Sequence, residues 1–225
     1  MTWDEHNQTI VACRRCPRLV AWREEVARTR RRAYRDQEYW GRPVPGFGDP
    51  QARILVVGLA PGAHGSNRTG RMFTGDASGD FLYPALHKAG FASQPNSDGL
   101  ADGLRLEELF ISAACRCAPP DNKPLPAEIT ACRPFLDTEI ELLAPRLEGF
   151  VALGHIAFDW LLDWYRRQGA SPDGAVFAHA ARFIPQPGLP WLITSYHPSR
   201  QNTQTGRLTA AMFDQVWQLA RGSLR

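Results

Sequence analysis

Short apolar runs alternate along this 225-residue chain with longer segments whose apolar residues recur at helical spacing. The runs are three or four residues long and carry β-branched or aromatic residues, as strands buried on both faces do. They lie at 54–57, 109–111, 150–153 and 191–194. Helices are predicted for residues 1–30, 81–89, 126–147, from 154 onward, and 205–219. This alternation predicts an α/β fold with a parallel sheet between two helix layers, and the length fits one domain over residues 1–225.

The first predicted strand runs into a loop of small residues, Gly58-Leu59-Ala60-Pro61-Gly62-Ala63-His64-Gly65. Small residues let a backbone pass close to a ligand, and open α/β sheets bind ligands at the carboxyl ends of their strands. The loop matches neither G-x-x-x-x-G-K-[ST] nor G-x-G-x-x-G, which disfavours a nucleotide cofactor. We therefore predict a backbone cradle around Ala60 and Gly62 for an anion or a carbonyl oxygen, with a tight turn as the alternative.

Three further residues are candidates for the same edge of the sheet. His197 directly follows the fourth predicted strand, so it and the glycine loop should face one crevice. A histidine there can donate to an oxygen that gains charge, and a structural histidine is the alternative. Asp76 precedes a predicted helix and is either its cap or a carboxylate that orients a water or faces a cationic sugar. Phe73 is either a stacking plate for a base or a core ring.

The basic residues of this chain are almost all arginines. Its formal net charge is +3, and only Lys88 and Lys123 among its 26 basic residues are lysines. The planar fork of arginine suits bidentate phosphate contacts. Five arginines gather in residues 28–35, which fits a nucleic-acid-binding face or a solvated helix face. A GC-rich genome or a thermophilic source explains the arginine usage equally well.

Cellular location is predicted from two features of the sequence. No apolar run approaches the ~20 residues of a membrane helix. Asp4, Glu5 and His6 stand where a secretory signal would be basic and then apolar. We therefore expect an intracellular protein.

Five cysteines, an odd number, do not fit a disulfide framework in such a protein. Cys13 and Cys16 form a C-x-x-C pair, and Cys117 and Cys132 lie far downstream. Four thiolates from distant segments suit Zn²⁺ or an iron–sulfur cluster, and the spacing does not separate the two. Cys115 is left over as a buried apolar residue. The alternative is that all five are ordinary buried thiols.

Four features together resemble the uracil-DNA glycosylase superfamily, and within it the iron–sulfur-containing family 5, or type b. They are Gly58–Ala63, the Gly-Arg-x-Phe-Thr-Gly-Asp stretch of 70–76, the cysteine arrangement and Tyr196-His197-Pro198-Ser199. The resemblance covers nearly the whole chain. It implies a three-layer α/β/α sandwich with a central four-stranded parallel sheet. It also implies a [4Fe-4S] cluster held by Cys13, Cys16, Cys117 and Cys132.

The activity implied by this resemblance is that of a monofunctional DNA glycosylase of base excision repair. Such an enzyme hydrolyses the N-glycosidic bond of uracil in double-stranded DNA and leaves an abasic site. Hypoxanthine and ethenocytosine are expected as further substrates. The expected enzyme is a cytoplasmic, nucleoid-associated monomer with no membrane contact. The alternatives are a non-catalytic, Cys-ligated nucleic-acid-binding module and a related glycosylase that prefers another lesion.

The resemblance also assigns roles to single residues. The related family 4 carries a water-positioning glutamate at the position of Leu59 and a uracil-reading asparagine at that of Ala113. Their absence here shifts the water or sugar-cation role to Asp76 and the reading of the base edge to Asn122. His197, with loop amides around Ala60 and Gly62, is expected to stabilise the departing base, and Phe73 to stack on it. Contacts to the DNA are expected from Arg68, Arg71, Ser199, Arg200 and Arg207. The polar run 200–203 replaces the apolar wedge of family 1.

Overall fold

The computed structural model describes all residues, 1–225, and shows one mixed sheet of six strands. The strand order is β1 (Phe47–Gly48), β3 (Leu109–Ala113), β2 (Ile54–Gly58), β4 (Gly149–Leu153), β6 (Trp191–Ser195) and β5 (Arg182–Phe183). The four inner strands are parallel, and they are the four that the apolar runs predict. The two edge strands pair antiparallel and were not predicted, because two residues carry no periodic pattern.

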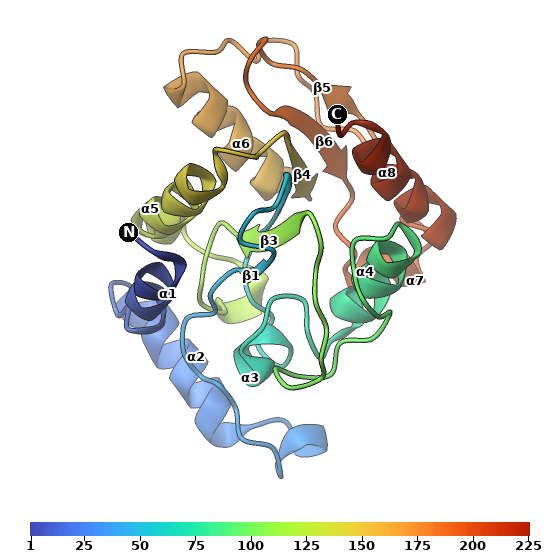
Figure 1. The fold of residues 1–225 in the computed structure, drawn as a ribbon. Coiled ribbons are helices and arrows are strands. Elements are labelled where there is room, and N and C mark those ends of the chain that lie inside the picture. Colours follow the sequence, from blue (N-terminus) through green and yellow to red (C-terminus); the bar gives the residue numbers. More distant parts are fainter.

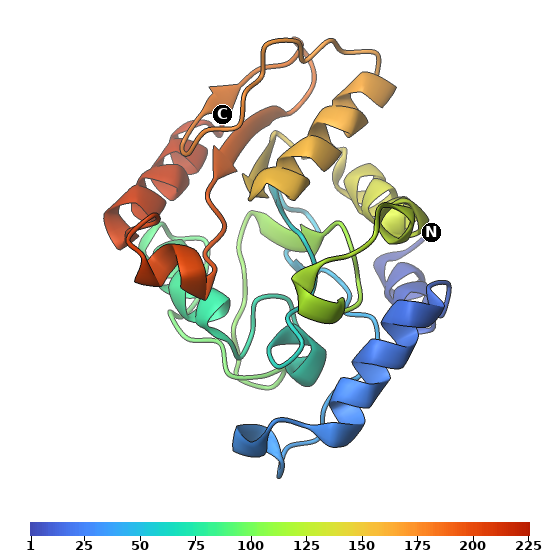
Figure 2. The same ribbon diagram turned by 180° about the vertical axis from the view of Figure 1, so that it is seen from behind.

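Helices cover both faces of this sheet, as the α/β prediction requires (Figures 1 and 2). One face packs on α4 (Ala77–Lys88) and α8 (Ala210–Gly222), and the other on α5 (Pro126–Leu143) and α6 (His155–Arg167). Within β2, Val56 belongs to the first core and Val57 to the second. The strands are continuous apolar runs because both of their faces are buried.

Two N-terminal helices, α1 (Trp3–Val11) and α2 (Pro17–Thr29), pack outside this three-layer arrangement. Thr2 and Glu5 form a capping box at the start of α1. His6 of α1 is buried, and its Nε2 lies 3.8 Å from a carboxylate oxygen of Glu139 on α5. Glu139 is fully buried and also accepts hydrogen bonds from Arg116 and Ser112. This buried polar network joins α1 to the sheet domain.

The remaining elements are short and lie mostly at the carboxyl edge of the parallel strands. They are α3 (Ser66–Thr69), α7 (Arg200–Gln204) and the 3-10 turns η1 (Arg32–Tyr34) and η2 (Pro120–Asn122). The predicted helix over 205–219 is present as α8 but begins at Ala210, because Gly206 takes φ +74° and Thr209 caps the helix. No helix combines the length and apolar character needed to cross a bilayer.

Candidate active site

A cavity of about 640 Å³ opens at the carboxyl edge of the parallel strands. The glycine loop after β2 supplies Ala60 and Gly62, and the turn before α4 supplies Asp76. The segment after β6 supplies His197. The two turns predicted to face one crevice therefore line one cavity, because parallel strands end at the same edge of the sheet.

Asp76 caps α4 and also presents a free oxygen to this cavity. Its Oδ1 accepts hydrogen bonds from the backbone N–H groups of Ser78 (3.0 Å) and Gly79 (3.2 Å). Its Oδ2 accepts none and faces the glycine loop, where a Cβ added to Gly62 would lie 2.8 Å from it and one added to Gly65 would collide with it. Burial raises the pKa of the Asp76 carboxyl, against the opposing effect of the two N–H donors. The prediction that Asp76 caps the helix is therefore confirmed.

His197 and Phe73 lie next to each other in the cavity wall. Their ring centroids are 5.8 Å apart, and their planes are inclined by 30°. Phe73 is 9% exposed and takes φ +51°, a left-handed conformation that is strained for an aromatic residue. Its ring lies over Gly58, where an added Cβ would be 3.0 Å from the ring. These two flat rings therefore form part of the wall of a pocket that suits a planar base.

The backbone N–H groups of Ala60 and Gly62 donate no hydrogen bond to the rest of the protein. Both residues line the cavity. Unpaired amides that face a pocket are donors for an oxygen or an anion of a ligand. Leu59 and Ala113 line the same cavity, so these two positions of its wall are apolar.

Arg68 does not line the cavity, and its hydrogen bonds hold together the loops that form the cavity wall. Its guanidinium donates to the carbonyls of His64 (2.8 Å) and Gly75 (2.7 Å) and to Oε1 of Gln37 (2.5 Å). It also lies 4.0 Å from the ring centroid of Tyr34. Arg68 is 9% exposed, so its donors hold the loops together and are not offered to a phosphate.

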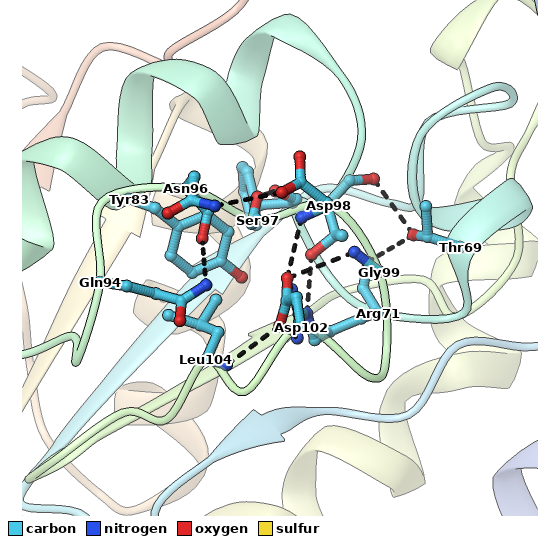
Figure 3. A network of polar contacts seen from close by, with 12 residues as sticks. Thr69, Arg71, Tyr83, Gln94, Asn96, Ser97, Asp98, Gly99, Asp102 and Leu104 are labelled. Carbon is cyan, nitrogen blue, oxygen red and sulfur yellow. Dashed lines mark hydrogen bonds and ion pairs between the residues drawn. The ribbon is translucent and has the colours of Figure 1, made fainter.

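Arg71 is likewise buried, in a network that fixes the turn before α4 (Figure 3). Its guanidinium pairs with both oxygens of Asp102 and donates to Oγ1 of Thr74. Asp102 also accepts from the N–H groups of Asp98, Gly99 and Leu104, which closes the loop over 98–104. The prediction that Arg71 binds phosphate is therefore wrong. Its donors are used inside the protein, where they position the turn that carries Phe73 and Asp76.

The other predicted DNA and base contacts lie at the outer rim. Asn122 is exposed, takes φ +55° at the end of η2 and lines the cavity. Ser199 caps α7, with its hydroxyl accepting from the N–H of Asn202. Ser199 and exposed Arg200 line the cavity, whereas Arg207 stands outside it with its guanidinium over the ring of Tyr196.

Two cavity-lining residues, Arg31 and Tyr34, were not predicted for the site. They follow α2, far from the glycine loop in sequence. The only signal in the sequence was the arginine cluster of 28–35, which did not indicate where that segment packs.

The four cysteines of the predicted ligand set line one small cavity between the N-terminal helices and α5. Arg15, Arg23 and Arg116 line it too, and Nη1 of buried Arg23 donates to Sγ of Cys117 at 2.8 Å. No three Cys, His, Asp or Glu side chains lie close enough together to hold a single metal ion. Cys115 is buried and does not line this cavity, which confirms its prediction as a buried apolar residue.

The partial burial of His197 in the cavity wall predicts an acid-sensitive stability. Desolvation lowers its pKa from 6.5 to about 4, so the folded protein keeps the ring neutral at neutral pH. Between these values the unfolded chain binds a proton that the folded chain does not, so stability falls as the pH is lowered. We expect the melting temperature to fall more for the wild type than for His197→Asn between about pH 7 and pH 5. Equal falls for the two proteins would contradict a neutral, desolvated ring.

Comparison of the sequence with known proteins shows the family of this chain. A sequence model described as the uracil DNA glycosylase superfamily matches residues 45–221. This range contains every strand of the sheet and leaves out the N-terminal helices α1 and α2. A type-5 uracil-DNA glycosylase of Thermus thermophilus is 59% identical over 93% of this chain and 92% of its own length. Type-5 enzymes of Mycobacterium bovis and Pyrobaculum aerophilum are 51% and 44% identical, over 96% and 95% of this chain and 80% and 90% of their own lengths. The chain therefore belongs to the uracil DNA glycosylase superfamily, within its type-5 group.

Proposed function

We propose that this chain is a DNA glycosylase that hydrolyses the bond between uracil and deoxyribose in double-stranded DNA and leaves an abasic site. The observation that carries the proposal is one cavity lined by Asp76, by His197 and by the loop residues Ala60 and Gly62. One carboxylate oxygen of Asp76 and the N–H groups of both loop residues have no hydrogen-bond partner within the protein. The cavity volume of about 640 Å³ lies in the usual range for a small-molecule site. Names of the type-5 relatives agree with this activity.

The target nucleotide must leave the duplex to reach such a cavity, which costs a few kcal/mol and is cheapest at a mismatch such as U·G. The base then lies against Phe73, with its edge within reach of Asn122. Bond breakage gives an oxocarbenium-like sugar and a base that carries negative charge. The Asp76 carboxylate stabilises the sugar cation and orients a water toward it, while neutral His197 and the two loop amides donate to the departing base.

Substrate range follows from the absence of an activating group at Leu59. Departure of the base then dominates the barrier, so damaged bases that leave readily should also be released. We propose hypoxanthine and ethenocytosine as such substrates. Ser199, Arg200 and Arg207 are proposed to contact the flanking DNA, whereas Arg68 and Arg71 are not, because their donors are used inside the protein.

We further propose that Cys13, Cys16, Cys117 and Cys132 hold a [4Fe-4S] cluster. A zinc ion draws four sulfurs to about 2.3 Å from one point. No three of the thiols here lie close enough together to hold a single ion. All four line one cavity, and a [4Fe-4S] cluster takes one thiolate at each of its irons. The buried guanidinium of Arg23, which donates to Cys117, supplies positive charge for thiolate ligands. The proposed role is structural, since the ligands join α2 and α5 to the segment after β3.

A panel of duplexes tests the function. Each duplex carries one lesion (uracil, thymine, hypoxanthine or ethenocytosine), and alkali after incubation reveals abasic sites. Release from the U·G duplex is expected, and His197→Asn should be slower by about 10²-fold, as when one oxyanion-hole donor is lost. The slower variant also excludes a contaminating glycosylase. Binding of the duplex without release of any base would favour the non-catalytic module instead.

A further inference from the structure

We infer that residues 30–37, called the arm here, form a DNA-backbone-binding surface at the rim of the active-site cavity. The inference rests on the proposed function, because it names how the substrate of that site is held. In Figures 1 and 2 the chain after α2 extends to one end of the molecule, beside α3. The arm begins at Arg30, whose φ of +53° ends α2 and turns the chain. A strained residue of this kind persists only where the surrounding structure holds it in place.

The arm is fixed to the wall of the cavity by specific contacts. The ring of Tyr34 covers the guanidinium of Arg68 at 4.0 Å, and Gln37 accepts a hydrogen bond from the same group. Arg68 in turn holds the carbonyls of His64 and Gly75, which lie in the two loops that carry the active-site groups. The arm and the catalytic loops therefore share one brace and keep a constant relative position.

Three arginines of the arm are free to bind a ligand. Arg31, Arg32 and Arg35 are exposed, and their guanidinium groups make no ion pair or hydrogen bond within the protein. In contrast, Arg28 on the preceding helix is paired with Glu25. The arm holds four arginines and one carboxylate, Asp36, and Glu38 directly follows it, so the segment keeps a net positive charge.

The position of the arm at the rim of the cavity indicates that its partner is the nucleic-acid backbone. Arg31 and Tyr34 line the cavity, and so does Arg200 from α7. A nucleotide whose base fills the cavity carries its own phosphates at the rim, and its neighbours in the strand extend from there across the surface. Most contacts that position a protein on DNA go to such phosphates, and arginine is the side chain best suited to them.

The test uses the full-length protein and a short duplex with one 2′-fluorinated deoxyuridine, whose glycosidic bond resists hydrolysis. Fluorescence anisotropy gives Kd at several salt concentrations for the wild type and for the triple variant Arg31→Ala, Arg32→Ala, Arg35→Ala. Each lost phosphate contact should reduce the slope of log Kd against log salt by about 0.9, so a reduction of about 2 to 3 is expected, with Kd raised at least ~10-fold. An unchanged slope and Kd would overturn the inference.

Three comparisons separate this result from other causes. Arg105→Ala with Arg166→Ala removes two exposed arginines at the opposite edge of the sheet and should leave the slope unchanged. Tyr34→Ala, which releases the arm from Arg68, should weaken binding, whereas Tyr34→Phe should retain it. Uracil release by the triple variant is measured at subsaturating enzyme, where the rate should fall in proportion to the loss of affinity. Loss of uracil release by the wild type itself would refute the proposed function and leave the binding result standing.

Discussion

Replacing Asp76 by asparagine is expected to slow uracil release by about 10³-fold under single-turnover conditions, with little change in stability. Asparagine is as good a helix N-cap as aspartate, so the hydrogen bonds to the N–H groups of Ser78 and Gly79 can be kept. What is lost is the negative charge of the oxygen that faces the cavity. The variant therefore separates the two roles that this residue combines, and the measurements are the release rate on U·G duplex and the melting temperature.

Asp80→Asn is the matched control for Asp76→Asn. Asp80 lies in the first turn of the same helix and also lines the cavity, but its side chain is exposed. Removing its charge should change the rate by less than about 3-fold. A full rate in Asp76→Asn, or an equal loss in both variants, would contradict a catalytic role for the Asp76 carboxylate.

The pH dependence gives a second readout of the same residue. Burial raises the pKa of the Asp76 carboxyl, and protonation removes the charge that the reaction needs. The rate of the wild type should therefore fall as the pH is lowered, beginning at a higher pH than for an ordinary aspartate. The residual activity of Asp76→Asn should not show this fall in rate at low pH.

Replacing Cys117 by serine is expected to abolish the visible absorption of an iron–sulfur cluster in anaerobically purified protein and to lower the melting temperature strongly. The thiolate would be one of four ligands, and a cluster bound only by the folded chain contributes its binding free energy to folding. The substitution also removes the sulfur to which buried Arg23 donates. The measurements are the absorption spectrum, the iron content and the thermal melt.

Cys115→Ala is the control, since Cys115 is two positions away, buried and outside the cavity that the other cysteines line. It should keep the absorption and the iron content of the wild type. A colourless wild-type protein with stoichiometric zinc would refute the cluster. Loss of absorption in Cys115→Ala but not in Cys117→Ser would show that the ligand set is wrong.

The sequence by itself determined the fold class and the edge of the sheet at which the site lies. Four apolar runs are enough for this, because a strand buried on both faces must be apolar throughout and the loops that follow parallel strands meet at one edge. The glycine loop and His197 were therefore predicted to face one crevice, and both line the same cavity. The family resemblance added the substrate class, which no spacing of residues supplies.

The tertiary structure alone decided what each arginine does. A guanidinium in a sequence looks the same whether it binds phosphate or a buried carboxylate, and its burial depends on segments distant in the chain. Arg71 is committed to Asp102, and Arg68 to the carbonyls of two loops, while Arg31 reaches the cavity from a helix end more than twenty residues before the glycine loop. Local patterns encode elements and their order, but the partner of a long polar side chain is chosen by packing, because only packing determines which acceptors lie within its reach.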